Sequence, residues 1–308
     1  MTKEKPIRIG YLAGTSYCGS TMMALLTNSH PQICSVGEAC LNRSLQRKGG
    51  LDYPCSCGKT LSDCEFWNHI FHAVQEKGFE LSAEKWTYDY RYKNPVLHKI
   101  LTLYPSSLFY RAFQQIAGAI FPGHGKRIAH IQRVNVAFVR SVLDLTKTDV
   151  FFDTSKALMR LSFLLENPAF DVRVVRIIRD VRAFANSSVK RGETLSIAAE
   201  HWKNYQQTVY HLTASVSPDK VMILRYEDLC GNPSHALQAV YRFLGLDAYE
   251  PPDAIDWSSQ HIIGNSIRLR DQLKVRLDES WRTKLSDADL NTVLAIAGEI
   301  NRDLGYTE

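Results

Sequence analysis

Short apolar runs alternate with stretches of helical periodicity along much of the chain. Four runs are short and rich in β-branched or aromatic residues, which predicts strands over 7–13, 150–153, 172–178 and 221–224. Each precedes a stretch of helical spacing, at 19–28, 157–166, 181–190 and 233–244. Because the strand runs lack polar alternation, we expect an α/β fold with a parallel sheet flanked by helices. A closing helix is predicted over 287–302, with Ser286 as its N-cap.

The pattern changes between about residues 40 and 145. Strand-like runs disappear there, and aromatic residues and helix formers dominate. We interpret this stretch as a mainly helical insertion within a single domain of residues 1–308. Ligands of open α/β sheets bind beyond the carboxyl ends of the strands, so such an insertion would supply one wall of a ligand site.

Composition and charge narrow the class of protein. A hydrophobic share of 45% and a charged share of 22% are typical of a soluble globular protein. No run approaches the roughly 18 apolar residues of a membrane span, and the N-terminus leads directly into a strand without room for a signal peptide. We therefore expect a cytoplasmic protein without a transmembrane segment. The net charge of +5 is scattered, which argues against nucleic acid as a partner but suits a small polyanionic cofactor.

The turn after the first strand nearly matches the phosphate-binding pattern G-x-x-x-x-G-K-[ST]. Gly14 and Gly19 have the required spacing and Thr21 has the position of the hydroxyl, but Ser20 stands where the lysine belongs. The missing lysine disfavours ATP or GTP chemistry. Backbone amides at a helix N-terminus still attract an anion. The loop is therefore predicted to bind a phosphate-like group other than a γ-phosphate.

Two further motifs follow predicted strands. Arg179 ends the third strand and Ser187 lies two helical turns later, so both could reach one anion. Tyr226 follows the fourth strand, where it could hydrogen-bond to a nucleotide or stack on it. Either motif alone also fits a structural ion pair or packing.

Taken in order, these motifs resemble the sulfotransferases that use 3′-phosphoadenosine 5′-phosphosulfate (PAPS), nearer to their carbohydrate and tyrosylprotein branches and bacterial relatives than to the aryl enzymes. The resemblance covers most of the chain except the insertion, and it implies a P-loop-type sheet with the insertion on the acceptor side. The implied 5′-phosphosulfate loop comprises Ser16, Tyr17, Cys18, Gly19, Ser20 and Thr21. The implied 3′-phosphate pair is Arg179 with Ser187, Tyr226 belongs to the recurring R-Y-E-D-L stretch, and the cofactor clamp includes Asn265 and Arg268.

The resemblance also implies catalytic residues. Relatives have a carboxylate eight residues after a His-Pro pair, and this position is Glu38, our predicted general base, with His130 as second choice. Relatives usually have Arg or Lys where Tyr17 stands, so another cation is needed over the transferred group. Lys156 is the predicted replacement. The fallback cations are Arg8, Arg43 and Arg133.

The implied reaction is sulfuryl transfer from PAPS to a hydroxyl of a carbohydrate, lipid or other small molecule, leaving 3′,5′-ADP. One alternative is a small-molecule P-loop kinase, for which Asp153 could hold Mg²⁺. Another is a non-catalytic nucleotide-binding protein of the same fold, which the departure at Tyr17 leaves open. The acceptor and the oligomeric state, a homo-oligomer included, are not fixed by the sequence.

The chain has seven cysteines, and an odd number in an expected cytoplasmic protein favours reduced thiols. Cys55, Cys57 and Cys64 lie close together. A zinc site would need a fourth ligand, and the sequence offers Cys40, His69 and His72. Because the paired C-x-x-C spacing is missing, we favour a structural turn and predict no metal ligand, with a local disulfide as an alternative.

Overall fold

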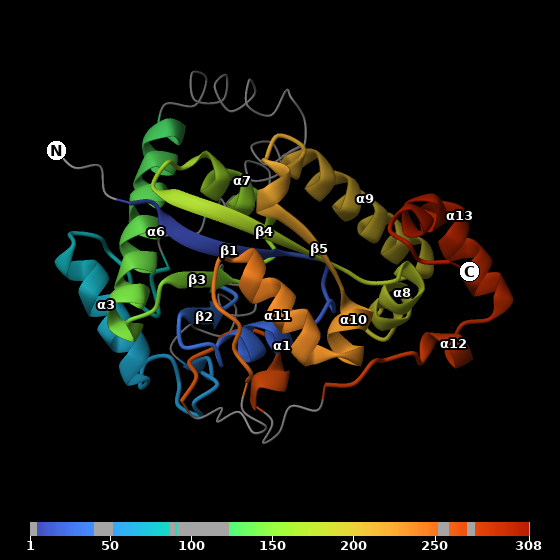
Figure 1. The fold of residues 1–308 in the computed structure, drawn as a ribbon, viewed down its shortest axis with the longest axis horizontal. Helices are drawn as coiled ribbons and strands as arrows, with labels where there is room; N and C mark the ends of the chain where they lie inside the picture. Colours follow the sequence, from blue (N-terminus) through green and yellow to red (C-terminus); the bar gives the residue numbers. More distant parts are fainter. Residues whose placement is uncertain are drawn as a thin grey trace.

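Five parallel strands form the central sheet (Figure 1), in the order β2-β3-β1-β4-β5. The computed structural model describes residues 5–39, 52–86, 90, 123–251, 259–269 and 275–307. The strands are β1 (Ile7–Ala13), β2 (Ile33–Gly37), β3 (Val150–Asp153), β4 (Phe170–Ile178) and β5 (Val221–Arg225). The predicted α/β fold with a parallel sheet is thus confirmed. Strand β2 was not predicted, because its five residues include a serine and a glycine and it is defined by pairing with β3.

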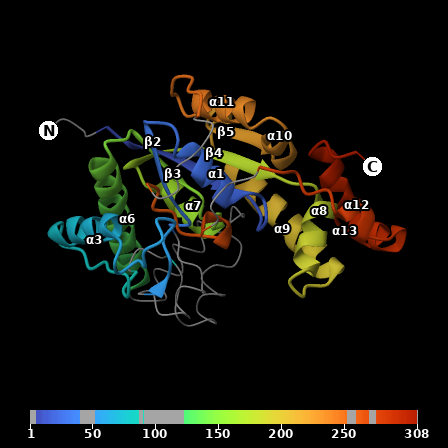
Figure 2. The same ribbon diagram turned by 90° about the horizontal axis from the view of Figure 1, so that it is seen from below.

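Helices cover both faces of the sheet, as the continuous apolar strand runs predicted. One face packs against α1 (Ser20–Thr27), α10 (Tyr226–Gly231) and α11 (Pro233–Phe243), and the other against α6 (His124–Thr146) and α7 (Leu158–Glu166). Figure 2 shows α10 and α11 on one side of the sheet and α7 on the other. Strand β1 serves both cores, because Ile9 packs in the cluster that contains Phe138 of α6, and Leu12 in the cluster that contains Met23 of α1.

A third cluster lies beyond the carboxyl end of β4. It joins α8 (Val181–Val189), α9 (Leu195–Thr213) and α13 (Asp287–Asp303) around the buried Trp202. The predicted N-cap of α13 is confirmed, since Ser286 and Asp289 form a capping box. The short α12 (Trp281–Lys284) lies beside α8, and two 3₁₀ helices are η2 (Pro218–Lys220) and η3 (Ser266–Leu269).

Within the expected insertion, the structure describes two helices, α3 (Glu65–Glu76) and α6. They pack on one another, and Trp67 of α3 lies in the same buried cluster as Phe151 of β3. Among the described helices, none combines the length and apolar character needed to cross a bilayer.

Candidate functional site

The turn between β1 and α1 exposes backbone amides at a helix N-terminus. Gly19 caps α1 with a φ of 82°, a left-handed conformation that glycine adopts without steric cost. No side chain caps this helix end, and its first turn contains no acidic residue. The free amides and the helix dipole therefore favour an anion beyond the carboxyl end of β1.

Lys156 brings a positive charge to this loop. Its Nζ lies 2.7 Å from Ser20 Oγ, at the very position where the phosphate-binding pattern lacks its own lysine. The residue follows β3 with a φ of 60°, a conformation that costs a non-glycine residue on the order of 1 kcal/mol. A hydrogen bond from Tyr205 Oη to the Lys156 carbonyl, 3.0 Å long, accompanies this conformation. The expected convergence of Lys156 and the loop is thus present.

Glu38 directly follows β2 and faces the same ammonium. Its Oε1 lies 2.7 Å from Lys156 Nζ, and the two side chains are 21% and 13% exposed, respectively. The Glu38 amide donates a 2.9 Å hydrogen bond to the Ile263 carbonyl. Gly37 permits this approach, since a Cβ there would lie 2.1 Å from the same carbonyl oxygen. The carboxylate is therefore held at the edge of the loop but stays open to solvent.

The two residues predicted to bind one anion, Arg179 and Ser187, also lie close together. Arg179 Nη1 lies 3.3 Å from Ser187 Oγ and donates a 2.8 Å hydrogen bond to the Tyr17 carbonyl. Its guanidinium lies over the ring of Tyr226, 4.6 Å from the centroid. Burial raises the pKa of the Tyr226 hydroxyl, which therefore stays protonated and able to donate a hydrogen bond. Beside this group, hydrogen bonds from Ser280, together with the charges of Lys190 and Arg179, lower the pKa of Asp278 to about 2.

Tyr17 is the second non-glycine residue of the site in a left-handed conformation, with a φ of 61°. Its ring packs near Phe184, and the guanidinium of Arg191 lies 4.9 Å from the ring centroid. Sequence reasoning did not single out Arg191. It lies in the turn after α8, beyond the last helical residue Val189, where helical periodicity no longer places a side chain. Two cations thus flank this loop, Lys156 beside Ser20 and Arg191 over the ring of Tyr17.

The remaining predicted loop and clamp residues have more structural contacts. Cys18 is fully buried beneath the loop, and this burial raises the pKa of its thiol. The Asn265 amide donates a 3.3 Å hydrogen bond to Thr21 Oγ1. Arg268 is 3% exposed, and its guanidinium donates to the carbonyls of Gly264 and Pro54. Arg268 therefore supports the wall of the site through its backbone contacts.

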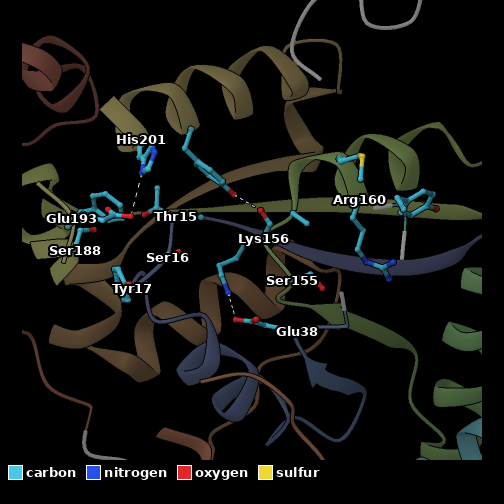
Figure 3. A pocket seen from close by; sticks show the side chains of 16 residues that line it. Thr15, Ser16, Tyr17, Glu38, Ser155, Lys156, Arg160, Ser188, Glu193 and His201 are labelled. Atoms are coloured by element: carbon cyan, nitrogen blue, oxygen red, sulfur yellow. Dashed lines mark hydrogen bonds and ion pairs between the residues drawn. The ribbon is translucent and has the colours of Figure 1, made fainter. Parts of the chain in front are cut away.

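Two cavities meet at this group of residues. The first, of about 410 Å³, extends toward α7, α8 and α9 and is lined by Met159, Phe184, Glu193 and His201 among others. The second, of about 750 Å³, runs past Gly19, Tyr226, Arg268 and Arg276. Both are lined by Ser16, Tyr17, Glu38 and Lys156. Figure 3 shows Lys156 and Glu38 directed toward one another in the first cavity, with His201 and Glu193 on its other side.

Several fallback candidates lie elsewhere. His130 is exposed on α6 against Phe79, and Arg133 is exposed on the same helix. Arg8 pairs with Asp149 near the amino end of the sheet. None of the three lines either cavity. Arg43 lies outside the described residues.

Asp153, the magnesium ligand required by the kinase alternative, is fully buried in an ion pair. Its Oδ2 lies 2.7 Å from Arg160 Nε, and neither side chain is exposed. Its Oδ1 accepts a 2.9 Å hydrogen bond from the Ser155 amide. Both carboxylate oxygens are thus engaged within the protein, which disfavours a metal ligand at this position.

Comparison with known proteins supports the geometric interpretation. A family model described as the sulfotransferase family matches residues 11–251. Carbohydrate sulfotransferase 1 of Danio rerio is 28% identical over 176 residues, covering 47% of this chain and 41% of that protein. Carbohydrate sulfotransferase 1 of Mus musculus is 27% identical over 180 residues, with the same shares covered. The chain thus matches about two fifths of the length of these relatives.

Two solved structures share the fold at low sequence identity. The sulfotransferase domain of the Synechococcus PCC 7002 olefin synthase is 15% identical with a TM-score of 0.50, covering 100% of this chain and 98% of that one. The sulfotransferase domain from the curacin biosynthetic pathway gives the same identity and TM-score, covering 98% and 99%. Since the family model matches well over half of the residues, the chain belongs to the sulfotransferase family.

Proposed function

We propose that the protein transfers a sulfuryl group from PAPS to a hydroxyl of a carbohydrate, lipid or other small molecule. The observation that favours this most is the position of Lys156 and Glu38. They form one ion pair beside the phosphate-binding loop, at the boundary between two cavities. A transferase needs such a boundary, because donor and acceptor must meet in line there.

The second cavity suits the donor. Among the described residues, its lining contains the cations Lys156, Arg191, Arg268 and Arg276, against a single carboxylate, Glu38. The loop amides would hold the 5′-phosphosulfate, Arg179 and Ser187 the 3′-phosphate, and Tyr226 the nucleoside. These hydrogen-bond donors and cations match the anionic oxygens of PAPS. When bound, PAPS supplies the sulfuryl group.

The reacting groups of the chain have separate tasks in this proposal. Glu38 accepts the proton of the acceptor hydroxyl, for which an open carboxylate at the cavity boundary is suited. Lys156 stabilises negative charge that develops next to Ser20, in the way that a preorganised cation lowers a transition-state barrier. Arg191 adds positive charge on the Tyr17 side.

The first cavity suits the acceptor. A volume of about 410 Å³ lies within the usual range for small-molecule sites. Its lining mixes apolar side chains such as Met159 and Phe184 with the hydrogen-bonding side chains of Glu193, His201 and Tyr205. Such a mixture can pack against a sugar ring while binding its hydroxyls, in keeping with relatives named carbohydrate sulfotransferases.

Two further expectations belong to this proposal. We infer one domain, because α3 and α6 share a buried cluster with β1 and β3. We also retain the cytoplasm as the predicted location, which fractionation of cells that express the chain would test.

Calorimetry with 3′,5′-ADP and ATP tests the donor assignment. We expect 3′,5′-ADP to bind and ATP to bind at least about tenfold more weakly, since Ser20 and the Asp153–Arg160 pair do not suit a Mg²⁺–triphosphate. Tight ATP binding without 3′,5′-ADP binding would refute the assignment. Transfer of radiolabelled sulfate from PAPS to a panel of sugars and lipids tests the reaction. Binding without any transfer would favour the non-catalytic alternative.

A further inference from the structure

A cluster of three thiols and an imidazole lies apart from the transfer chemistry. It comprises Cys55, Cys57, Cys64 and His261, and its four potential ligand atoms all lie within 4.8 Å of one another. Cys55 and Cys57 belong to the turn before α3, and Cys64 is the N-cap of that helix. His261 arrives from a distant part of the chain. Of the candidates that the sequence offered, His69 and His72 were wrong for this cluster, since His69 is exposed on α3 and neither histidine belongs to the group, whereas Cys40 lies outside the described residues.

The separations fit a tetrahedral metal site. Zinc–sulfur bonds of about 2.3 Å at tetrahedral angles separate two sulfurs by about 3.8 Å, and a sulfur from a nitrogen by about 3.6 Å. The Sγ atoms of Cys57 and Cys64 lie 3.7 Å apart, and those of Cys64 and Cys55 3.9 Å apart. His261 Nδ1 lies 3.3 Å from Cys64 Sγ and 3.9 Å from Cys55 Sγ.

The backbone around the cluster is fixed by contacts that need no metal. Ser56, between two of the cysteines, donates through Oγ to the Gln260 carbonyl at 2.7 Å and accepts from the Ile262 amide at 2.7 Å. These bonds clamp the chain on both sides of His261. The imidazole also stacks on Phe66, with centroids 4.5 Å apart and planes 5° apart. Such outer contacts orient metal ligands before the ion binds.

We propose a structural zinc site whose ligands are Cys55, Cys57, Cys64 and His261. Three thiolates and one neutral imidazole form a closed set with no position left for substrate, as in structural zinc sites. Binding releases the thiol protons to solvent. The thiols are free and their sulfurs are too far apart for an S–S bond of about 2.05 Å, so no disulfide competes in this arrangement.

The site would tie the turn at residues 52–65 to the segment at residues 259–269. That segment forms a wall of the second cavity, which residues 264–269 line. The Ile263 carbonyl accepts from the Glu38 amide, and the Gly264 carbonyl accepts a 2.7 Å hydrogen bond from Tyr53 Oη. The zinc therefore has a positioning role. Its existence does not depend on the transfer reaction.

Metal analysis of the full chain, purified without an affinity tag or added chelator, tests the proposal. Native mass spectrometry and elemental analysis should find one zinc ion per chain, and Cys64→Ser and His261→Ala should lose it. His69→Ala is the matched control and should keep it. His261→Cys should also keep zinc, because a cysteine Sγ lies close to where Nδ1 lies, whereas a role confined to stacking on Phe66 would not be rescued.

Measurements on the unaltered protein test the proposal even if the ligand variants do not fold. Removal of zinc by a chelator should lower the melting temperature by about 5 °C or more, and added zinc should restore it. Cobalt in place of zinc should give the absorption of a tetrahedral thiolate site. Three results would overturn the proposal: purified protein without zinc that takes up none on incubation, zinc that persists in both ligand variants, or cysteines that titrate under denaturing conditions only after reduction.

Discussion

Two ion pairs lie near the carboxyl end of β3, each formed by one carboxylate and one cation, but their surroundings differ. Asp153 and Arg160 are both fully buried, and each has further partners inside the protein. Glu38 and Lys156 are 21% and 13% exposed and line both cavities. The first pair holds the turn between β3 and α7 in place, whereas the second faces the cavities, where we propose that it meets a ligand. Exposure and neighbours, rather than the residue types, separate a structural pair from a candidate catalytic pair.

The largest effect should come from breaking the buried pair. Arg160→Met leaves the Asp153 carboxylate buried without its cation, and we expect a loss of about 3–5 kcal/mol in the free energy of unfolding, measured with urea. Asp153→Asn combined with Arg160→Met should be less destabilised than Arg160→Met alone, because no charge is then buried. A loss below about 1 kcal/mol in Arg160→Met would contradict the contrast between the two pairs.

Glu38→Gln should chiefly affect the reaction. A glutamine can still accept a hydrogen bond from Lys156 but cannot take up a proton from the acceptor, so we expect sulfate transfer to slow by about 10³-fold, or about 4 kcal/mol. Binding of 3′,5′-ADP should change little. Glu80→Gln, which alters an exposed pair with Lys85, is the matched control. Unchanged transfer in Glu38→Gln would rule out Glu38 as the base.

Lys156→Ala should slow transfer by about 10²-fold, or about 2.7 kcal/mol, because it removes the cation beside Ser20. The free energy of unfolding should change by less than about 1 kcal/mol, as for other partly exposed pairs. Lys220→Ala removes a lysine paired with Asp171 at 2.6 Å near the amino end of the sheet, and it should leave transfer unchanged. Equal losses in transfer and in 3′,5′-ADP affinity would restrict Lys156 to donor binding.

The smallest effect should be on affinity alone. Ser187→Ala removes a hydroxyl 3.3 Å from Arg179, and calorimetry should find 3′,5′-ADP binding weakened by about tenfold. Binding of adenosine 5′-phosphate, which lacks the 3′-phosphate, should be the same in this variant and in the unaltered protein. A similar loss for both nucleotides would assign Ser187 to helix packing instead.

Much of the fold could be predicted because its signals are local. Apolar runs predicted β1 and β3 with their observed bounds, and helical periodicity with Ser286 as N-cap predicted the start of α13. The short β2 escaped, since its definition depends on a neighbouring strand. The long helix α9 was also missed, although its N-cap Thr194 is a recognisable signal.

The candidate site could be predicted where its residues lie close together in the sequence. Arg179 and Ser187 lie two helical turns apart on one stretch of chain, where helix geometry limits the outcome, whereas Glu38 was predicted from the resemblance to the family. The ammonium of Lys156 on Ser20, the ring contact of Arg191 and the approach of His261 to three thiols depend on tertiary packing. Lys156 was predicted from the resemblance to the family, and no spacing rule could indicate the other two contacts.

The segment at residues 259–269 contacts the phosphate-binding loop from far along the sequence, and this separation determines when the site is completed during synthesis. Thr21 bonds to Asn265 across 244 positions, and Cys55 contacts His261 across 206. A ribosome adds about 5–20 residues per second, so roughly ten to fifty seconds separate synthesis of the loop from synthesis of the segment that contacts it. A nascent chain that has formed β1 and α1 thus still lacks the Ile263 carbonyl that accepts from the Glu38 amide. Competence to bind the proposed donor is therefore expected among the last properties that the growing chain acquires.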